Sequence, residues 1–498
     1  MKTENPFSET RGPRFRNLIG GEWRDSCTGA LFVDENPANT RECVAVFPQS
    51  SHEDAKAAIE AASEAQDKWE SMTPPQRGKL LYKTAEILEQ QKEELARTLT
   101  REEGKILPES RVEVGRAIDI FRYFAGEGHR LNGEVIPSED PGMLLYTQKQ
   151  PLGIVSIITP WNFPIAIPSW KLAPALICGN VVIFKPASLT PLIGFKIVEG
   201  LEKAGLPAGV VNFVTGPGSS VGMELIQNQA IDGISFTGSY DVGREIYRCG
   251  AEANTMPRLQ LEMGGKNPLV VLSDAKLDVA VDITVKGAFG GTGQSCTATS
   301  RAIVESAVVD EYTRLLVEQV RRMKIGNGLD QTTEMGPVVS EAELKKDLDY
   351  VEIGRKEGAQ LAYGGKQLKG AGYDSGHFME PTIFVNVKRD MRIAREEIFG
   401  PVLSIITAND FNDALQLAND AEYGLAASIC TNSLERAHAF VQGVQAGVVK
   451  VNRPTTGIFV QAPFGGMKKS SSMTFKEQGK AAIDFYTFSK SVYMGVKG

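Results

Sequence analysis

From residue 51 onward, apolar positions recur every three or four residues, and this spacing predicts amphipathic helices. Ser51 followed three residues later by Asp54 is typical of a capping box, in which two side chains satisfy backbone N–H groups at a helix start. After residue 130, β-prone segments at 133–136 and 144–148 flank the turn sequence Glu-Asp-Pro-Gly. We therefore expect a helix-rich N-terminal part followed by a hairpin within residues 131–151, which we call the arm.

Beyond the arm, apolar runs of strand length alternate with segments of helical periodicity. The predicted strands are 153–159, 180–185, 210–214 and 233–237, and the predicted helices are 170–178, 189–204 and 219–227. A second series of the same kind runs from residue 268 to about 464. Such alternation is typical of an α/β fold with an open, doubly wound parallel sheet. The last stretch, 481–494, is β-prone, and we expect it to pair with the arm.

The composition is that of an ordinary folded protein and argues against several functional classes. Hydrophobic residues make up 42% of the 498 residues and charged residues 23%, close to the average for globular proteins. The net charge of −7 and the lack of a basic block argue against nucleic-acid binding. No apolar run reaches the roughly 18 to 20 residues of a membrane span, and the polar start shows no signal segment. We expect a cytoplasmic protein that does not enter a membrane.

The cysteines and histidines do not follow a disulfide or metal-binding pattern. Six cysteines are spread along the chain without a Cys-x-x-Cys pair, and none of the four histidines has metal-ligand spacing. We therefore expect free thiols, one of which is a candidate for reactivity, and no metal site.

Three segments each combine small or rigid residues with one chemically active side chain. A glycine-rich loop, 289–296, delivers Cys296 just before an apolar strand, where a thiolate can attack a carbonyl beside backbone N–H donors. Glu262 closes an apolar strand next to a Gly-Gly bend, which suits a mobile general base. Asn162 follows a buried strand in a rigid loop and offers an amide donor. Each also has a structural interpretation, as a buried thiol, a surface acid and a turn cap, respectively.

Seven short motifs occur in the order found in the aldehyde dehydrogenase superfamily, which the chain resembles from Asn17 to about Thr487. The motifs are PWNFP (160–164), FKPAS (184–188), FTGS (236–239), EMGGK (262–266), GQSC (293–296), EEIFGP (396–401) and PFGG (463–466). The resemblance implies the aldehyde dehydrogenase fold, with a Rossmann-like open parallel sheet for the cofactor, a second α/β catalytic domain and a β oligomerisation arm.

The resemblance also implies how the active side chains work together. Cys296 resembles the nucleophile that forms a thiohemiacetal with the aldehyde, and the Asn162 side chain with the Cys296 backbone N–H resembles the oxyanion hole. Hydride transfer to the nicotinamide then leaves a thioester. Glu262, 34 residues before the cysteine, resembles the base that activates the hydrolysing water, so a free carboxylic acid is the expected product. We include Lys171 among the catalytic candidates.

Cofactor contacts are implied by position as well. Lys185 resembles the residue that reaches the adenosine ribose, and Gly238 with Ser239 resembles the helix start that faces the pyrophosphate. Glu397 and Phe399 resemble the contacts to the nicotinamide ribose and ring. The other cofactor-binding candidates are Thr159, Pro160, Trp161, Gly218, Phe236, Glu262 and Gly264.

Ser188 bears on the choice between NAD and NADP. Members that prefer NAD often carry a glutamate at this position, which binds the ribose 2′-hydroxyl and repels a 2′-phosphate. Serine removes that charge and can donate to phosphate oxygens, while Lys185 supplies a positive charge. We therefore expect that NADP is accepted, with NAD as the alternative.

The segments 452–456 and 461–472 most resemble those of the 2-oxoglutarate semialdehyde (2,5-dioxopentanoate) dehydrogenases. The substrate-binding candidates are Phe163, Arg453 and Phe464, and Arg453 would bind a distal carboxylate of the aldehyde. A structural surface ion pair is an equally good interpretation of Arg453. Arg301, five residues after the nucleophile, is expected to organise its strand rather than to select a substrate.

Other functions stay open at this point. Succinate semialdehyde dehydrogenases often carry an Arg-Lys pair where this chain has Trp170-Lys171, which weakens that alternative without excluding it. A broad-range aldehyde dehydrogenase is a further alternative. A non-catalytic structural member of the fold is disfavoured, because such members typically lose the nucleophile or its partners, and Cys296, Glu262 and Asn162 are all present here.

The resemblance finally divides the chain into domains and predicts self-association. Residues 1–130 and 152–261 are expected to form the NAD(P)-binding domain, and residues 262–465 the catalytic domain. The arm, 131–151, and the tail, 480–498, would form the oligomerisation element. Exposed strand edges in these two segments predict a homodimer or homotetramer.

Overall fold

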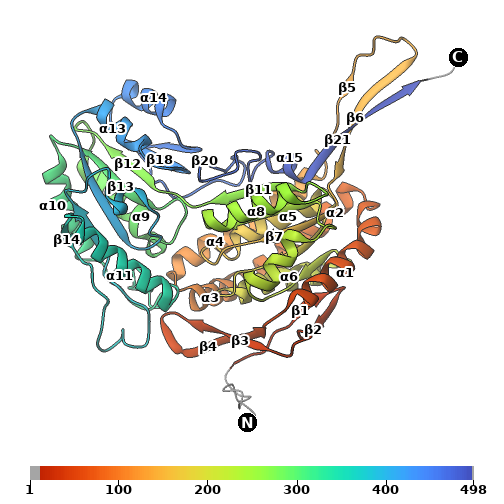
Figure 1. Ribbon diagram of the computed structural model, residues 1–498, viewed down its shortest axis with the longest axis horizontal. Helices are drawn as coiled ribbons and strands as arrows, with labels where there is room; N and C mark the ends of the chain where they lie inside the picture. The colour runs from red at the N-terminus through yellow and green to blue at the C-terminus, as the bar shows by residue number, and fades with distance from the viewer. Residues whose placement is uncertain (1–11, 496–498) are drawn as a thin grey trace.

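The computed structural model describes residues 12–495, which form two large open sheets and a narrow arm that projects from one end (Figure 1). Residues 1–11 and 496–498, which include most of the polar N-terminal stretch and the end of the predicted tail, lie outside the described part. None of the described helices is both long enough and apolar enough to cross a membrane.

The first sheet contains seven strands drawn from both sides of the arm. They are β1 (Asn17–Ile19), β2 (Glu22–Arg24), β7 (Ile154–Ile158), β8 (Val181–Lys185), β9 (Val211–Phe213), β10 (Gly233–Gly238) and β11 (Arg258–Met263). Their order is β11-β10-β7-β8-β9-β1-β2. The five strands from β11 to β9 run parallel, which confirms the prediction of a parallel sheet. The antiparallel edge formed by β1 and β2 was not predicted.

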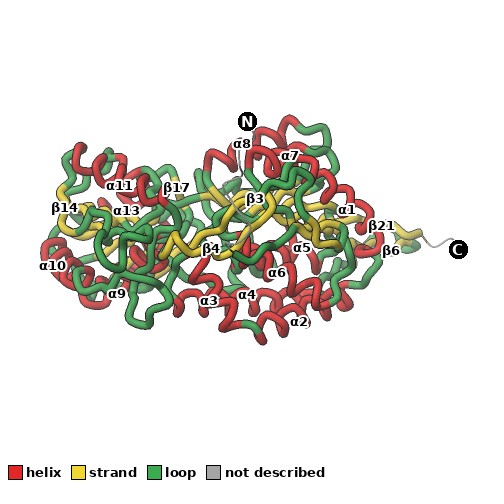
Figure 2. The backbone as a smooth tube through the Cα atoms, turned by 90° about the horizontal axis from the view of Figure 1, so that it is seen from below, coloured by secondary structure: helices red, strands yellow, loops and turns green. Residues whose placement is uncertain are grey.

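Helices cover both faces of this sheet. They are α1 (His52–Glu70), α2 (Pro74–Gln90), α3 (Lys92–Glu103), α4 (Leu107–Glu127), α5 (Ala166–Ile177), α6 (Pro191–Ala204), α7 (Met223–Gln227) and α8 (Tyr240–Glu252), with a π-helical turn η1 (Gly218–Gly222). Figure 2 shows α1, α7 and α8 on one side of the strands and α2, α3, α4 and α6 on the other. The capping box at the start of α1 is confirmed, because the Ser51 N–H donates to Asp54 Oδ2 at 2.9 Å.

The second sheet follows the first along the chain and has the same doubly wound character. Its strands are β12 (Asn267–Val271), β13 (Thr299–Glu305), β14 (Gln360–Tyr363), β15 (Thr382–Val385), β16 (Val402–Ala408), β18 (Ala426–Cys430) and β19 (Val448–Val451), in the order β14-β15-β16-β13-β12-β18-β19. Only the β14–β15 pair is antiparallel among these strands. Two apolar clusters, one on each face, hold the helices to the sheet.

The helices of the second half lie on opposite sides of this sheet. They are α9 (Leu277–Phe289), α10 (Val309–Val320), α11 (Glu341–Lys356), α12 (Arg392–Arg395), α13 (Phe411–Asn419) and α14 (Leu434–Gly443), with a 3-10 turn η2 (Gly290–Gly293) after α9. Figure 2 shows α9 and α10 on one side and α11 and α13 on the other. Outside the two large sheets, two small antiparallel pairs form: β3 (Leu31–Asn36) with β4 (Asn39–Pro48), and β17 (Tyr423–Gly424) with β20 (Met467–Lys468).

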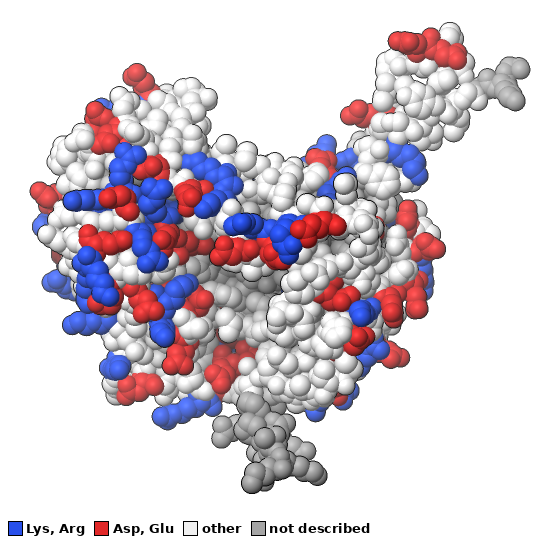
Figure 3. All heavy atoms as spheres, viewed as in Figure 1, with Lys and Arg blue, Asp and Glu red and all other residues white. Residues whose placement is uncertain are grey.

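The arm is a three-stranded antiparallel sheet that includes the C-terminal tail. Its strands are β5 (Val135–Ile136), β6 (Met143–Pro151) and β21 (Thr487–Gly495), in the order β21-β6-β5. The predicted pairing of tail and arm is therefore confirmed. The tail is not β-structured from residue 481, however, since Ala482–Tyr486 form the short helix α15, which buries Phe485 and Tyr486 in the core of the first sheet. On the face seen in Figure 3, few charged side chains cover the arm apart from an acidic tip.

One short crossing joins the two sheets and defines where a ligand can bind. Only Gly264, Gly265 and Lys266 separate β11 from β12, so the carboxyl end of the first sheet lies next to the amino end of the second. Ligands of open α/β sheets bind beyond the carboxyl ends of the strands. The buried Arg301 braces this junction, because its guanidinium donates to the carbonyls of Lys266 at 3.1 Å, Leu417 at 2.9 Å and Ala418 at 3.0 Å. This is the strand-organising role expected for it.

Candidate active site

A cavity of about 360 Å³ lies beside the crossing and contains Cys296 and Asn162 in its wall. Its aromatic walls are Phe163, Trp170 and Phe464, and further lining comes from α4 and from the loop after β19. This volume is in the usual range for small-molecule sites. A second hollow of about 690 Å³, between α9 and α10, contains none of the candidate residues.

The loop before Cys296 depends on left-handed backbone conformations. Gly291, Thr292 and Gly293 have φ values of 56°, 57° and 69°. A Cβ atom on Gly293 would lie 2.4 Å from the Gly400 carbonyl oxygen, so only glycine fits there. The Asn267 side chain then fixes the cysteine backbone, because Nδ2 donates to the carbonyl of Cys296 at 2.8 Å. The glycines thus set the position of the thiol.

Asn162 is buried in the loop after β7 and points its amide at the cysteine loop. Its Nδ2 donates to the Gln294 carbonyl at 3.0 Å, two residues before Cys296. The backbone carbonyl of Asn162 accepts a hydrogen bond from Lys105 Nζ at 2.6 Å. The amide donor and the thiol are therefore brought together, as the family resemblance implied.

The Cys296 thiol is half-buried in the cavity wall, within electrostatic reach of three carboxyl groups. Burial raises the pKa of this thiol, and the carboxyl groups of Glu262, Glu397 and Glu477 raise it further. The resting thiol therefore keeps its proton at neutral pH. A nucleophilic step requires that the thiolate be stabilised or its proton removed.

Glu262 lies at the second-to-last position of β11 and is 2% exposed. The alternative interpretation of Glu262 as a surface acid is thus wrong, and the segment that carries Ser471 pairs with its backbone. Burial raises the pKa of Glu262 well above its usual range, and the neighbouring Glu477 raises it further. A Cβ on Gly465 would come within 2.7 Å of Glu262 Oε1, so a glycine there leaves room for the carboxyl group.

Lys171 forms a fully buried ion pair beside Glu262. Its Nζ contacts Glu477 Oε1 and donates to Ser235 Oγ at 2.9 Å. Lys171 opposes the upward shift of the Glu262 pKa, whereas Glu477 reinforces it. The pair therefore adjusts the proton affinity of the candidate base. Sequence reasoning named Lys171 but missed Glu477, which lies in a loop without a recognisable motif.

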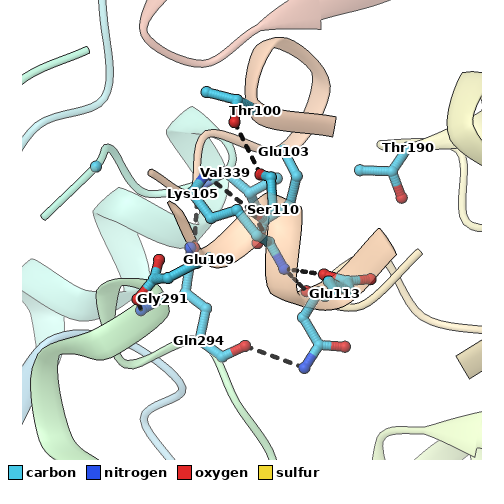
Figure 4. A network of polar contacts seen from close by, with 12 residues as sticks. Thr100, Glu103, Lys105, Glu109, Ser110, Glu113, Thr190, Gly291, Gln294 and Val339 are labelled. Atoms are coloured by element: carbon cyan, nitrogen blue, oxygen red, sulfur yellow. Dashed lines mark hydrogen bonds and ion pairs between the residues drawn. The ribbon is translucent and has the colours of Figure 1, made fainter. Parts of the chain in front are cut away.

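A second buried network, which sequence reasoning also missed, forms the wall of the cavity. Lys105 Nζ donates to Glu113 Oε2 at 2.6 Å and lies 3.7 Å from Glu103 Oε2. Figure 4 shows Glu103, Glu109 and Glu113 gathered around Lys105. Glu113 Oε1 also accepts the N–H groups of residues 165 and 166 at the start of α5. Burial raises the pKa of Glu103 to about 8.

The candidate nicotinamide side lies on the other side of the crossing. Glu397 Oε1 accepts the Gly265 N–H at 2.8 Å, and burial raises the pKa of this carboxyl group to about 7. A Cβ on Gly264 would lie 1.9 Å from Glu397 Oε2, so the bend must be glycine. The rings of Trp161 and Phe399 lie 5.3 Å apart, nearly perpendicular.

The candidate adenosine side combines a buried amine with open backbone. Lys185 donates to the Pro186 carbonyl at 3.2 Å, makes no ion pair within residues 12–495, and has its pKa lowered to about 8 by burial. Ser188 Oγ donates to the Gly216 carbonyl at 3.3 Å, and a Cβ on Gly218 would meet only open space. An amine without an acid partner, beside a hydroxyl and an open turn, fits the ribose and phosphate groups of a dinucleotide.

The remaining candidates are distributed around these sites. Ser239 caps the start of α8 by accepting the Val242 N–H at 3.4 Å, and Gly238 leaves room for the ring of Phe236. Thr159 is buried at the end of β7, directly before the Pro160-Trp161 loop. Arg453 is exposed and does not line the cavity that contains Cys296.

The thiol should show its raised pKa in its reactivity. In the cofactor-free enzyme, alkylation of Cys296 by iodoacetamide should be slow at pH 7 and accelerate above pH 8, because only the thiolate reacts. The Glu262→Gln variant lacks one of the neighbouring negative charges at every pH, so its rate profile should shift to lower pH. Peptide mass spectrometry separates this signal from that of the exposed Cys27, and Cys296→Ser is the blank. A rate already maximal at pH 7 would contradict the protonated resting thiol.

Comparisons with known proteins agree with this geometry. The model of the aldehyde dehydrogenase family matches residues 23–492. The chain is 49% identical to the alpha-ketoglutarate semialdehyde dehydrogenase of Haloferax volcanii, over 96% of this chain and 98% of that one. It is 46% identical to the 2,5-dioxopentanoate dehydrogenase of Saccharolobus solfataricus, over 94% and 97% of the two chains. A crystal structure of betaine aldehyde dehydrogenase from Staphylococcus aureus in complex with NAD⁺ superposes with a TM-score of 0.94 at 36% identity and covers 96% of this chain and 95% of that one. The chain therefore belongs to the aldehyde dehydrogenase family.

Proposed function

We propose that this enzyme catalyses the NAD(P)-dependent oxidation of 2-oxoglutarate semialdehyde to 2-oxoglutarate through a thioester on Cys296. The observation that carries the chemistry is the placement of Cys296 beside the Asn162 amide, within electrostatic reach of Glu262, in the wall of a small-molecule cavity. The substrate is supported by the names of the Haloferax and Saccharolobus relatives, each of which matches at least 94% of the chain.

In the first chemical step the Cys296 thiol releases its proton to solvent, and the resulting thiolate attacks the aldehyde carbon. The new C–S bond converts the carbonyl oxygen into an oxyanion. The Asn162 side-chain N–H, which donates to the Gln294 carbonyl in the described structure, and the Cys296 backbone N–H would donate to this oxyanion. Such fixed donors are worth about 3 to 4 kcal/mol each in comparable sites. A bound nicotinamide cofactor, which Lys185, Glu397 and their neighbours would hold, would supply the two-electron oxidant that removes a hydride from this carbon and leaves a thioester on Cys296.

The second step is hydrolysis of the thioester to the free acid. Glu262 would take a proton from water, whose oxygen attacks the acyl carbon while the C–S bond breaks and the thiolate leaves. A carboxyl group with a raised pKa is a stronger base when ionised, which suits this role near neutral pH. The buried Lys171–Glu477 pair contributes to the Glu262 pKa, which Glu477 raises and Lys171 lowers.

The substrate proposal is tested by initial rates with 2-oxoglutarate semialdehyde, succinate semialdehyde and pentanal. The semialdehyde of 2-oxoglutarate should have the highest kcat/KM and exceed uncharged pentanal by about tenfold or more, since each tenfold corresponds to about 1.4 kcal/mol of differential binding. Equal or better oxidation of pentanal would show a broad-range enzyme instead. A higher rate with succinate semialdehyde would identify that acid as the substrate.

One observation weighs against succinate semialdehyde. The position that carries arginine in many of those dehydrogenases is Trp170 here, which is 4% exposed and packs against Phe464 with ring centroids 6.0 Å apart. An indole at this wall offers apolar surface and no positive charge to a short acid.

We propose further that NADP is accepted as cofactor. Ser188 is exposed in the middle of the loop after β8, three residues after the buried Lys185, and carries no negative charge. Ser188→Glu should lower kcat/KM with NADP by about tenfold or more, because its carboxylate repels a 2′-phosphate, and should change the value with NAD much less. Ser188→Gln, of similar size and without charge, is the matched control. Equal losses with both cofactors in Ser188→Glu would contradict a charge-based preference.

We also propose a homo-oligomer that assembles through the arm. Apolar side chains stand exposed on it, including Val135 at 78% and Tyr493 at 68% exposure, and β5 leaves a free strand edge. Replacing Val135 and Tyr493 by aspartate should lower the mass found by sedimentation, while an unchanged mass would show assembly elsewhere. The free cysteines support a cytoplasmic location, which cell fractionation would test.

A further inference from the structure

A cation without a described partner lies in the wall of the cavity that contains Cys296, which we call the aldehyde cavity. Arg116, on α4, is half-buried and lines the cavity that contains Cys296. Its guanidinium makes no hydrogen bond and no ion pair with any residue between 12 and 495. Burial lowers its pKa, and the charge of Glu113 opposes that shift. A half-buried guanidinium that no acid pairs with is available to a ligand that carries a negative charge.

The carboxyl group near Arg116 is already committed to other donors. Glu113 Oε2 accepts from Lys105 Nζ at 2.6 Å, and Oε1 accepts two backbone N–H groups at the start of α5, both at 3.2 Å. Glu113 is 3% exposed and held by these contacts. It therefore neutralises Lys105 and leaves Arg116 available.

The other charged groups of the cavity wall either form an ion pair or have a raised carboxyl pKa. Lys286 pairs with Asp282 at 2.6 Å. Burial raises the pKa of Glu103 to about 8, and it also raises the pKa of Glu109, whose Oε1 accepts the Gly291 N–H. The raised pKa values favour the neutral forms of these two acids and Lys286 is already paired, so Arg116 is the cation of this wall that no described acid pairs with.

Two more cations stand behind the loop that closes this wall. Lys450 Nζ donates to the Thr456 carbonyl at 2.6 Å and also contacts the Gly457 carbonyl, and both residues line the cavity. Burial lowers the pKa of Lys450 to about 8, and the charges of Arg116 and Arg453 lower it further. Arg453 therefore lies within electrostatic reach of the cluster without entering the cavity. The region as a whole favours an anion.

We propose that Arg116 determines substrate specificity by binding the distal carboxylate of the aldehyde while the aldehyde carbon sits at Cys296. This inference rests on the proposed function and replaces Arg453, the sequence candidate, by a residue that faces the cavity. The planar guanidinium can bind both oxygens of the carboxylate of a 2-oxo acid. An acidic aldehyde satisfies the donors that the protein leaves unused, whereas a neutral aldehyde does not.

The test compares Arg116→Gln, Arg116→Lys and Arg453→Gln with the unchanged enzyme. Arg116→Gln should lower kcat/KM for 2-oxoglutarate semialdehyde by about 100-fold, mainly through KM, because a buried charged contact is lost. Its kcat/KM for pentanal should stay within about threefold of the original value, which also shows that the variant folds. Arg116→Lys should recover part of the loss. The matched control is Arg122→Gln on the exposed side of the same helix, where Arg122 pairs with Glu89 and Asp119.

A second readout does not require the semialdehyde. Glutarate, a five-carbon dicarboxylate, should inhibit pentanal oxidation competitively, and Arg116→Gln should raise its inhibition constant about 100-fold, whereas Arg122→Gln should not. If the unchanged enzyme prefers the semialdehyde and Arg116→Gln keeps both that preference and the glutarate inhibition, Arg116 is not the carboxylate site and the proposed function stands. A selective loss in Arg453→Gln alone overturns the inference as well. If the unchanged enzyme shows no preference for the semialdehyde, the proposed substrate and the inference both fail.

Discussion

The buried ammonium group of Lys105 joins the segments that form the aldehyde cavity. Lys105 follows α3, and its Nζ pairs with Glu113 on α4. The same Nζ donates to the backbone carbonyl of Asn162 and lies 4.3 Å from the centre of the Phe163 ring. Removing one partner from such a buried pair costs about 3 to 5 kcal/mol, because the other charge stays behind unpaired. Glu113 also holds the start of α5, the helix that carries Lys171. The candidate oxyanion donor Asn162 and the helix that carries Lys171 are therefore both held, directly or through Glu113, by the same cation.

A second constraint is the number of carboxyl groups that the site buries. Glu262 and Glu397 lie within electrostatic reach of Cys296, and burial raises the pKa of both, that of Glu397 to about 7. A raised pKa means that the neutral form persists to higher pH. A buried acid that holds its proton avoids most of the cost of burying an anion, and this lets the carboxyl groups lie close together.

The sequence allowed the frame of this structure to be predicted, together with the residues that bear the chemistry. Strand and helix periodicity located the parallel strands, and the Gly-Gln-Ser-Cys loop singled out Cys296 because its glycines have a visible geometric purpose. The network of Glu103, Lys105 and Glu113 could not be found in this way. Charged residues on helices normally face solvent, and only the packing of α3 and α4 against the loop after β7 buries these.

The same limit explains the other differences. Arg453 is close in sequence to the C-terminal motifs, yet it is exposed and does not line the cavity, while Arg116, from a helix with no motif, lies in the cavity wall. The short helix α15 interrupts a β-prone tail because Phe485 and Tyr486 gain more from the core than from a strand. In each case a tertiary contact decides between options that local sequence leaves equal.

The two sides of Cys296 are built from separate residues. The cavity wall contains Arg116, Phe163 and Phe464, whereas the candidate dinucleotide groups Lys185 and Glu397 do not line it. The thiol is the point where these two sets of residues meet. The cofactor site and the aldehyde site can therefore change independently. Substitutions in one recognition surface, whether by evolution or by design, leave the residues of the other surface unchanged.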